Sequence, residues 1–277
     1  AALKTRLKDS VTRPLVILMY HALYANEREL QDITPKDRPY AVSTQRFAEQ
    51  LQAMRDAGLP FVDPARLGEP QVRDGGVLLS FDDGHASNCT HALPELARHD
   101  ARAVFFITSD FVERRPGFCS WTQLREMADA GMTLGSHGRS HRFLNDLGDT
   151  EAVAELRDSR DALQDRLGQA VDQVSFPGGR YRAELLPAWR QLGYRWFHSS
   201  EIGCVPPHKL LSGADGTLPR LAIRQDTSTA TCLTMARADR PWLLKARGVA
   251  TAKQWLRRTA GNRLYHLLYE RLHRSRA

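Results

Sequence analysis

A junction that occurs four times constrains the fold of this chain more than any other feature. In each copy a helical pattern ends in a small turn and continues into an apolar strand: LQAMRDAGLPFVD, LARHDARAVFFIT, REMADAGMTLGSH and WRQLGYRWFHS. Three copies place a glycine (Gly58, Gly131 or Gly193) where a helix C-terminus requires a left-handed residue. Helices that alternate with strands in this way predict an α/β fold.

The strands are expected to be parallel because their apolar runs are continuous rather than alternating, as in LVILMY (15–20), which indicates that both faces are covered. We expect strands at 15–20, 77–81, 103–108, 132–136, 173–176, 194–198 and 218–223, with a possible further one at 61–62. Seven or so parallel strands with helices between them form either a barrel or a doubly wound sheet. After about Asp226 the pattern is wholly helical. The expected organisation is a lead-in over 1–13, an α/β domain over 14–226 and a basic helical extension over 227–277.

The net charge of +7 belongs to the C-terminal segment, where nine Lys or Arg and one acid lie between Pro241 and Ala277. Four aromatic residues (Trp242, Trp255, Tyr265, Tyr269) and several leucines are spaced among these cations. One interpretation is a helix that packs on the main domain and exposes a basic face. The other is contact with an anionic membrane surface, where lipid-linked sugars reside. No nucleic acid is expected as a partner, because no recognised motif accompanies the charge.

The location of the protein is only weakly constrained. No run approaches 18 apolar residues, and the N-terminal segment AALKTRLKDSVTRP is too polar for a secretion signal. The four cysteines are widely spaced and form no CxxC pair, which favours a reducing compartment. We expect a cytoplasmic or membrane-peripheral protein, with the periplasm as the alternative if a signal was removed before Ala1.

Residues that can ligate metal or move protons follow five of the seven expected strands. These are His21, the pair Asp82 and Asp83, His137 with His141 in SHGRSH, Arg180 with Tyr181 in FPGGRYR, and His198. Because the carboxyl ends of parallel strands meet on one face, we expect these side chains to converge.

His137 and His141 form an HxxxH pair, which would place two imidazoles on one side of a helical turn. Taken alone, the pair could be two structural or surface histidines. A carboxylate from another strand end changes this interpretation, because two His and one Asp leave open metal positions for water and substrate.

Asp82 and Asp83 are adjacent at the end of a buried strand, where two like charges repel each other. One acid could cap a helix that begins near Asn88, but a cap does not require two. A divalent cation bound by Asp83 would remove the repulsion and leave Asp82 ionised beside it as the general base.

The motifs SFDDG (80–84), SHGRSH (136–141) and SFPGG (175–179) resemble, in order, the first three motifs of the NodB-type polysaccharide deacetylases, carbohydrate esterase family 4. The opening LMYHAL resembles the branch that acts on exopolysaccharides. The resemblance covers residues 14–224 and implies a distorted (β/α) barrel with a divalent metal, usually zinc. It implies Asp82 as the base, Asp83, His137 and His141 as the metal ligands, and a backbone N–H near Gly178 as an oxyanion donor, with Gly179 and Tyr181 on the substrate side.

Three departures from this family mark open assignments. Gly138 replaces the usual Ser or Thr after the first histidine, so Ser136 or Ser140 is expected to supply that hydrogen bond. Ser175 replaces the arginine of the third motif, and Arg180 is the candidate to orient the base. The late Leu-x-His motif of the general acid is missing, which leaves His21, slightly ahead, and His198 as candidates.

The resemblance implies removal of N-acetyl groups from an amino sugar in a glycan or a lipid-linked precursor. Alternatives are a deformylase or cyclic amidase on the same fold, and a glycan-binding or assembly protein whose site has decayed, which the missing acid motif keeps open. A glycosidase is a weaker alternative, because it would use two carboxylates and give His137 and His141 no catalytic role.

Overall fold

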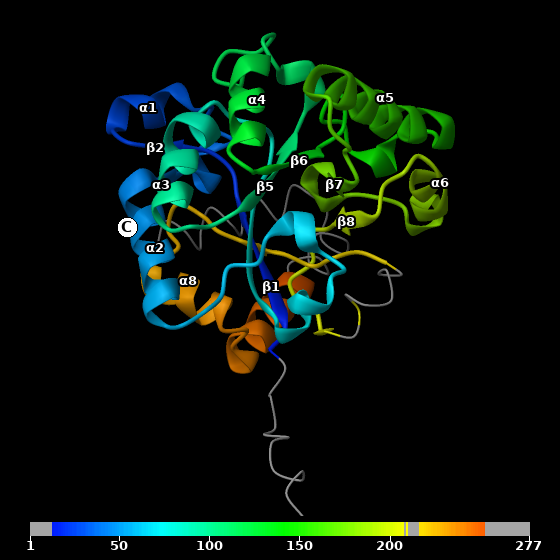
Figure 1. Ribbon diagram of the computed structural model, residues 1–277. Helices are drawn as coiled ribbons and strands as arrows, with labels where there is room; N and C mark the ends of the chain where they lie inside the picture. Colours follow the sequence, from blue (N-terminus) through cyan, green and yellow to red (C-terminus); the bar gives the residue numbers. More distant parts are fainter. Residues whose placement is uncertain (1–12, 208, 210–215, 253–277) are drawn as a thin grey trace, which may run out of the picture. The chain divides into compact units, whose positions relative to one another are not determined.

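The computed structural model describes residues 13–207, 209 and 216–252, and its central element is a sheet of seven parallel strands (Figure 1). The strand order is β8-β7-β6-β5-β4-β1-β9. The bounds are β1 (Leu15–Tyr20), β4 (Gly76–Phe81), β5 (Ala103–Ile107), β6 (Thr133–Ser136), β7 (Gln173–Ser175), β8 (Trp196–His198) and β9 (Leu221–Ala222). Each of the seven strands expected from the sequence is present. Phe61 forms only an isolated bridge to Val77.

The sheet curls so that its two edges approach each other. Leu221 and Ala222 pair with β1, and Leu218, three residues earlier, bridges His198 at the end of β8. The amide of Ser199 donates to the carbonyl of Leu218 at 2.9 Å. Residues 218–222 therefore lie between β1 and β8. This contact closes the sheet into the expected distorted barrel.

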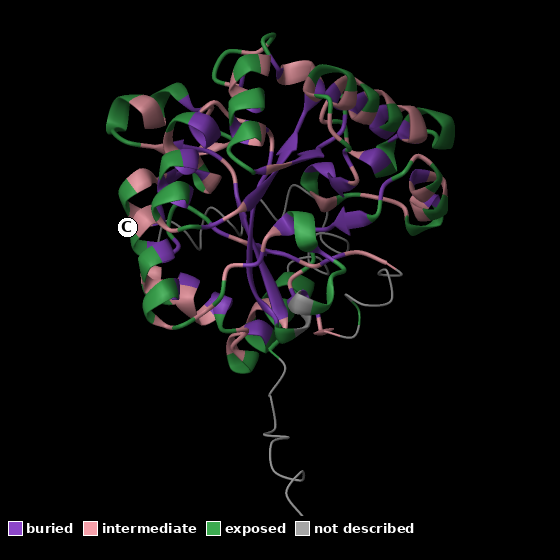
Figure 2. Cartoon of the chain, viewed as in Figure 1, coloured by how far each residue is buried: buried purple, intermediate pink, exposed green. Residues whose placement is uncertain are grey.

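The helices lie around the outside of the sheet, and the strands between them are buried along their length (Figures 1 and 2). The helices are α1 (Glu27–Asp32), α2 (Thr44–Asp56), α3 (Leu93–Arg98), α4 (Trp121–Asp129), α5 (Asp149–Leu167), α6 (Leu186–Gln191) and α8 (Thr229–Ala236). Gly58, Gly131 and Gly193 have φ values of +65°, +81° and +102°, so the predicted left-handed helix ends are confirmed. The sequence did not reveal β2 (Leu23–Tyr24) and β3 (Val42–Ser43), which pair with each other.

The alternation of side chains along β4 decides which groups face the barrel interior. Phe81 points outward, where its ring lies 5.7 Å from that of Phe47 on α2. Ser80 and Asp82 point the other way, and both contact Arg220 inside the barrel. An apolar cluster fills the rest of this interior: Leu15, Ile17, Val62, Leu67, Val72, Leu78, Val104, Phe106, Trp196, Val205 and Leu218.

The chain divides into two compact units, Ala1–Arg237 and Ala238–Ala277. The first extends past the boundary expected at 226, because α8 packs against α2 and β1. In the second, residues 240–252 are helical, and Leu244 and Val249 are exposed. The cations and aromatic residues of 253–277 lie outside the described residues. Within the part that the structure describes, no helix is both long and apolar enough to cross a membrane.

Candidate active site

Asp82 and Asp83 point in different directions because the backbone changes conformation between them. Asp82 continues the strand, and its amide donates to the carbonyl of Tyr20 at 3.0 Å. Asp83 has a φ of +76°, a left-handed conformation that is uncommon for residues other than glycine. The turn allows two adjacent carboxylates to serve different partners. Neither acid caps a helix, since the segment Asn88–Ala92 begins after Ser87 without a side-chain cap.

Asp83 lies against the two histidines of the SHGRSH motif. Its Oδ1 is 3.3 Å from Nε2 of His137 and 3.1 Å from Nε2 of His141. One candidate ligand atom from each of the three residues lies within 4.8 Å of the others. Burial would raise the pKa of Asp83, but the two imidazoles lower it well below its usual value. Oδ1 is buried and has no conventional hydrogen-bond partner in the described part of the chain. This donor set and this orphaned oxygen fit a divalent cation such as zinc.

The two histidines are brought together by a loop and not by the helical turn that the HxxxH spacing suggested. Residues 137–141 are not helical, and Gly138 and His141 have φ values of +78° and +63°. His137 is buried, and its Nδ1 lies 2.8 Å from the carbonyl oxygen of Ser175. This contact fixes the ring with Nε2 toward Asp83.

Asp82 is held by Arg220, a residue to which the sequence assigned no role. Nη1 and Nη2 of Arg220 donate to Oδ1 and Oδ2 of Asp82 at 2.7 and 2.8 Å. Ser175 adds a hydroxyl donor to Oδ2 at 3.1 Å. Burial would raise the pKa of Asp82, but the Arg220 guanidinium and His137 outweigh it and lower this pKa to about 2. The carboxylate is therefore ionised at neutral and mildly acidic pH.

The sequence suggested that Arg180 orients Asp82, but the structure places Arg180 elsewhere. Its guanidinium lies over the ring of Phe143, 4.3 Å from the centroid, and the residue is exposed. Arg220 instead approaches Asp82 from the segment before β9, since the curl of the sheet brings that segment beside β4. Arg220 thus makes, from the segment before β9, the contact expected of the arginine missing from the third motif.

Of the two histidines proposed as general acid, only His21 lines the cavity beside Asp82 and Asp83. Burial lowers the pKa of His21, and the two aspartates oppose this effect. Its Nδ1 is buried without a partner among the described residues. His198, in contrast, is fully buried, and its Nε2 lies 3.1 Å from Oε1 of Gln173. It is a core histidine, because it has no access to the cavity.

The proposed oxyanion and substrate residues follow β7 but do not line this cavity. Gly178 and Gly179 both have positive φ values, +60° and +66°. Phe143 occupies the space beside Gly178, 2.7 Å from where a Cβ would stand. The ring of Tyr181 stacks on Phe176 at 4.5 Å. The oxyanion role of this turn stays a prediction.

The cavity that contains Asp82 and Asp83 has a volume of about 50 Å³. This is room for roughly four water molecules. Ala22 and Ile33 contribute apolar surface to its wall, and His21, His85 and Arg115 contribute polar groups. The site thus combines an ionised carboxylate, three residues that could hold a metal ion and the His21 imidazole around a small cavity.

Comparison with known proteins agrees with this geometry. Residues 69–197 match the family model described as polysaccharide deacetylase. YxkH of Bacillus subtilis (strain 168), which is named as a polysaccharide deacetylase, is 26% identical over 204 residues, 72% of this chain and 69% of that protein. A chitooligosaccharide deacetylase of Rhizobium leguminosarum bv. trifolii is 29% identical over 142 residues, 50% of this chain and 63% of the relative.

Solved structures show the same architecture. The Streptococcus pyogenes deacetylase PplD in complex with acetate superposes with a TM-score of 0.68 and 26% identity, covering 80% of this chain and 98% of that one. IcaB from Ammonifex degensii has a TM-score of 0.66 with 24% identity and similar coverage of 82% and 98%. The fold and the site define a hydrolase with a curled parallel barrel. Residues 69–197 of this chain form a polysaccharide deacetylase domain.

Proposed function

We propose that this protein is a zinc-dependent deacetylase that hydrolyses the N-acetyl group of an amino sugar in a polysaccharide or its precursor. The observation that carries the proposal is the separation of the two aspartates. Asp83 faces two imidazoles at 3.1 and 3.3 Å, whereas Asp82 is bonded to Arg220. Two imidazoles and one carboxylate leave coordination positions open, as in hydrolytic zinc sites. The chitooligosaccharide and peptidoglycan deacetylases among the relatives support a glycan substrate.

The roles of the residues follow from their surroundings. Asp83, His137 and His141 would hold the zinc ion, which when bound lowers the pKa of water and polarises a carbonyl. Asp82, kept ionised by Arg220, would accept a proton from the attacking water. His21 would donate a proton to the sugar nitrogen as the carbon–nitrogen bond breaks, so that the products are acetate and a free amine.

The cavity supports an acetyl group as the acyl part of the substrate. An acetamide has four non-hydrogen atoms, which matches room for roughly four water molecules. Ala22 and Ile33 are 6% and 5% exposed and give the methyl group an apolar contact. A sugar ring would have to remain outside the cavity.

Two alternatives share parts of this site. A deformylase or cyclic amidase would use the same metal ligands and base on a different amide. A decayed glycan-binding protein would retain the fold without turnover, but the retained base, imidazole and ligand triad favour an active enzyme.

Metal analysis combined with product release tests the proposal. Purified protein should bind one zinc ion and release acetate from at least one substrate among acetylated chitooligosaccharides, peptidoglycan fragments and lipid-linked N-acetylated sugars. The Asp82→Asn variant should keep zinc and lose turnover, whereas Asp83→Ala should lose zinc. Formate release would favour the deformylase, zinc binding without any product would favour the binding protein, and zinc retained by Asp83→Ala would contradict the ligand assignment.

A further inference from the structure

The two histidines of the candidate metal centre are held in different ways. His137 is anchored twice, by its amide, which donates to the carbonyl of Ile107 at 2.8 Å, and by its Nδ1 at Ser175. For His141, whose side chain is 29% exposed, no other residue of 13–207, 209 and 216–252 makes a hydrogen bond to Nδ1. Metal-ligating imidazoles usually have such a partner on the second nitrogen. The position of His141 is therefore set by the ring of Phe111, which stacks on the imidazole with the centroids 5.9 Å apart, and by the backbone.

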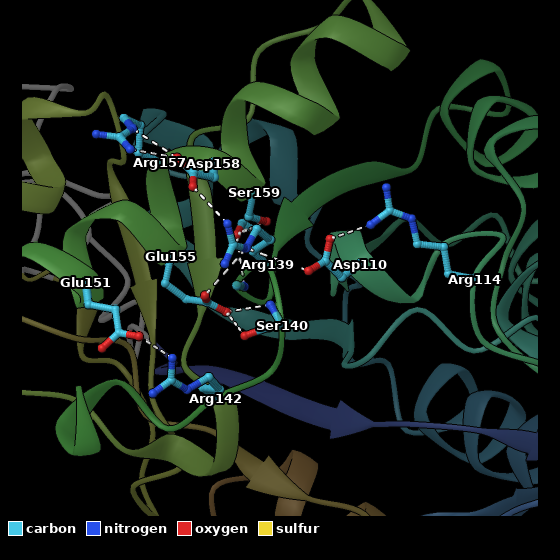
Figure 3. Close-up of polar contacts among 12 residues, drawn as sticks. Asp110, Arg114, Arg139, Ser140, Arg142, Glu151, Glu155, Arg157, Asp158 and Ser159 are labelled. Carbon is cyan, nitrogen blue, oxygen red and sulfur yellow. Dashed lines mark hydrogen bonds and ion pairs between the residues drawn. The ribbon is translucent and has the colours of Figure 1, made fainter.

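That backbone is in a conformation that the surroundings must hold. His141 has a φ of +63°, which costs about 1–3 kcal/mol for a residue other than glycine. The residue before it, Ser140, is fixed by one acceptor: Oε1 of Glu155 on α5 receives the Ser140 amide at 2.5 Å and its hydroxyl at 2.8 Å. These two bonds are drawn in Figure 3. They orient the peptide that leads into His141.

Glu155 is buried to an extent unusual for a carboxylate on a helix. Its side chain is 2% exposed, and it lies on the same face of α5 as Ala152, Leu156 and Ser159. Burial of an acid is costly unless charge or hydrogen bonds compensate it. Ser140 supplies two donors, and Nε of Arg139 lies 3.9 Å from Oε2. The groups that compensate the buried Glu155 carboxylate thus come from the loop 137–141 itself.

Glu155 also occupies the space next to Gly138. A Cβ on Gly138 would lie 3.4 Å from Oε1 of Glu155. The φ of Gly138, +78°, also disfavours any residue with a side chain. The other edge of the loop is held by the amides of Ser109 and Asp110, which donate to the carbonyls of Gly138 and Arg139 at 3.2 and 2.8 Å. The loop is clamped between the end of β5 and α5.

We propose that Glu155 is a positioning residue of the metal centre, which sets the Ser140–His141 peptide so that Nε2 of His141 faces Asp83. The inference rests on the proposed zinc site. Glu155 touches neither the cavity nor a ligand side chain, so it acts through Ser140. Its partner Ser140 is one of the two serines expected to supply the hydrogen bond that Gly138, without a side chain, cannot make.

Zinc affinity, measured by competition with a chromophoric chelator, tests this role. Glu155→Ala should weaken zinc binding about 10–100-fold, the usual effect of removing a supporting residue. Glu155→Gln keeps an oxygen acceptor for both Ser140 donors and should stay within about threefold of the wild type. Glu151→Ala is the matched control, because Glu151 is one turn earlier on α5 and pairs with the exposed Arg142 (Figure 3). It should bind zinc as the wild type does.

A second measurement does not involve zinc. In the metal-free protein the Ser140 amide should exchange with solvent slowly in the wild type and in Glu155→Gln, and faster in Glu155→Ala. A folded Glu155→Ala variant with wild-type zinc affinity would overturn the inference. If that variant does not fold, Ser140→Ala decides: a loss of about threefold or more in zinc affinity supports the role, and no loss contradicts it. A wild-type protein that binds no zinc would instead refute the proposed function.

Discussion

The Arg220–Asp82 pair is the most deeply buried charge interaction in the described part of the chain. The Arg220 side chain is fully buried and that of Asp82 is 4% exposed. A bidentate contact of this kind fixes the plane of the carboxylate as well as its charge. It therefore determines both the direction in which the base accepts a proton and the pH range over which it is ionised.

Replacing Arg220 with Met should weaken the fold and change the pH dependence. Leaving the Asp82 carboxylate buried without its partner should cost about 3–5 kcal/mol in the free energy of unfolding. Burial would then dominate, so the pKa of Asp82 should rise from about 2 to above its ordinary value. Urea unfolding and a pH profile of kcat/KM measure both effects, with zinc content followed at each pH. Activity should decline at a higher pH on the acid side than in the wild type. An unchanged profile would show that Asp82 is not the base.

The stability difference between wild type and Arg220→Met should itself depend on pH. The pKa of Asp82 is lowered in the folded wild type from 3.8 to about 2. The ionised carboxylate therefore contributes stability above pH 3.8 that is lost as the pH falls toward 2, about 2 kcal/mol in all. The variant lacks this contribution, so the two unfolding free energies should begin to converge at the raised pKa of Asp82 in the variant and continue to converge as the pH falls toward 2. A constant difference over this range would mean that another group causes the destabilisation.

His21 and His198 should respond differently to substitution, although both follow a strand. His21→Ala should lower kcat about 10²–10⁴-fold, as expected for loss of a general acid, and retain zinc. His198→Ala should destabilise the fold by about 1–3 kcal/mol, because it leaves Oε1 of Gln173 without its partner in the core. Its folded fraction should turn over within a few-fold of the wild type. Steady-state kinetics together with thermal unfolding separate these outcomes, and the reverse pattern would transfer the acid role to His198.

Among the elements, the loop 137–141 depends most on its neighbours. It crosses from β6 toward α5 with two residues at positive φ, and its geometry is imposed by Glu155 on one side and the 109–110 segment on the other. A resemblance between motifs therefore does not guarantee that a residue can be exchanged. The surrounding elements must also accommodate it.

Gly138→Thr, which restores a residue usual in the family, should weaken this protein. A β-branched residue at a φ of +78° is strained by about 1–3 kcal/mol, and its Cβ would contact Glu155. We expect a lower melting temperature and weaker zinc binding. The matched control is Gly148→Thr at the N-cap of α5, where φ is −63° and no atom lies within 4 Å of the added Cβ. That variant should be neutral or slightly more stable. Improved zinc binding by Gly138→Thr would contradict the account of the loop.

The sequence predicted the elements wherever a local pattern carries the information. Continuous apolar runs revealed the seven strands because both of their faces are covered. The candidate ligands Asp83 and His137 were identifiable because they lie within two residues of a strand end, and His141 because of its spacing from His137. β2 and β3, of two residues each, are too short to show a pattern. His141 reached its position through a loop, since Gly138 and His141 adopt positive φ values in place of the helical turn that the spacing suggested.

The supporting residues escaped prediction because their partners are distant in the chain. Arg220 lies 138 residues from Asp82, and only the curl of the sheet reveals their contact. The available signal was a lone arginine within the apolar segment LPRLAI. For Glu155 the signal was an acid on the apolar face of a helix pattern, but the bond to Ser140 depends on how α5 packs beside β6.

At the scale of the whole molecule, charge is divided unequally between two units. The +7 of the chain resides in the segment after residue 240, and the α/β unit is close to neutral. The described part of that segment exposes Leu244 and Val249 at 69% and 48%. Apolar residues among cations are typical of a segment that contacts an anionic lipid surface.

We therefore predict that the protein sediments with vesicles that contain anionic lipid and not with neutral vesicles. Each Lys or Arg near such a surface contributes about 1 kcal/mol. Changing Arg257, Arg258 and Arg263 to Gln should thus weaken binding about 100-fold, and raising the salt concentration should weaken it further. Zinc content and acetate release from a soluble substrate should not change, because these residues lie outside the α/β unit. A control with three substitutions to Gln at Arg28, Arg66 and Arg157 removes the same charge from that unit. If the control loses vesicle binding to the same extent, net charge is responsible and the basic segment is not a specific attachment site.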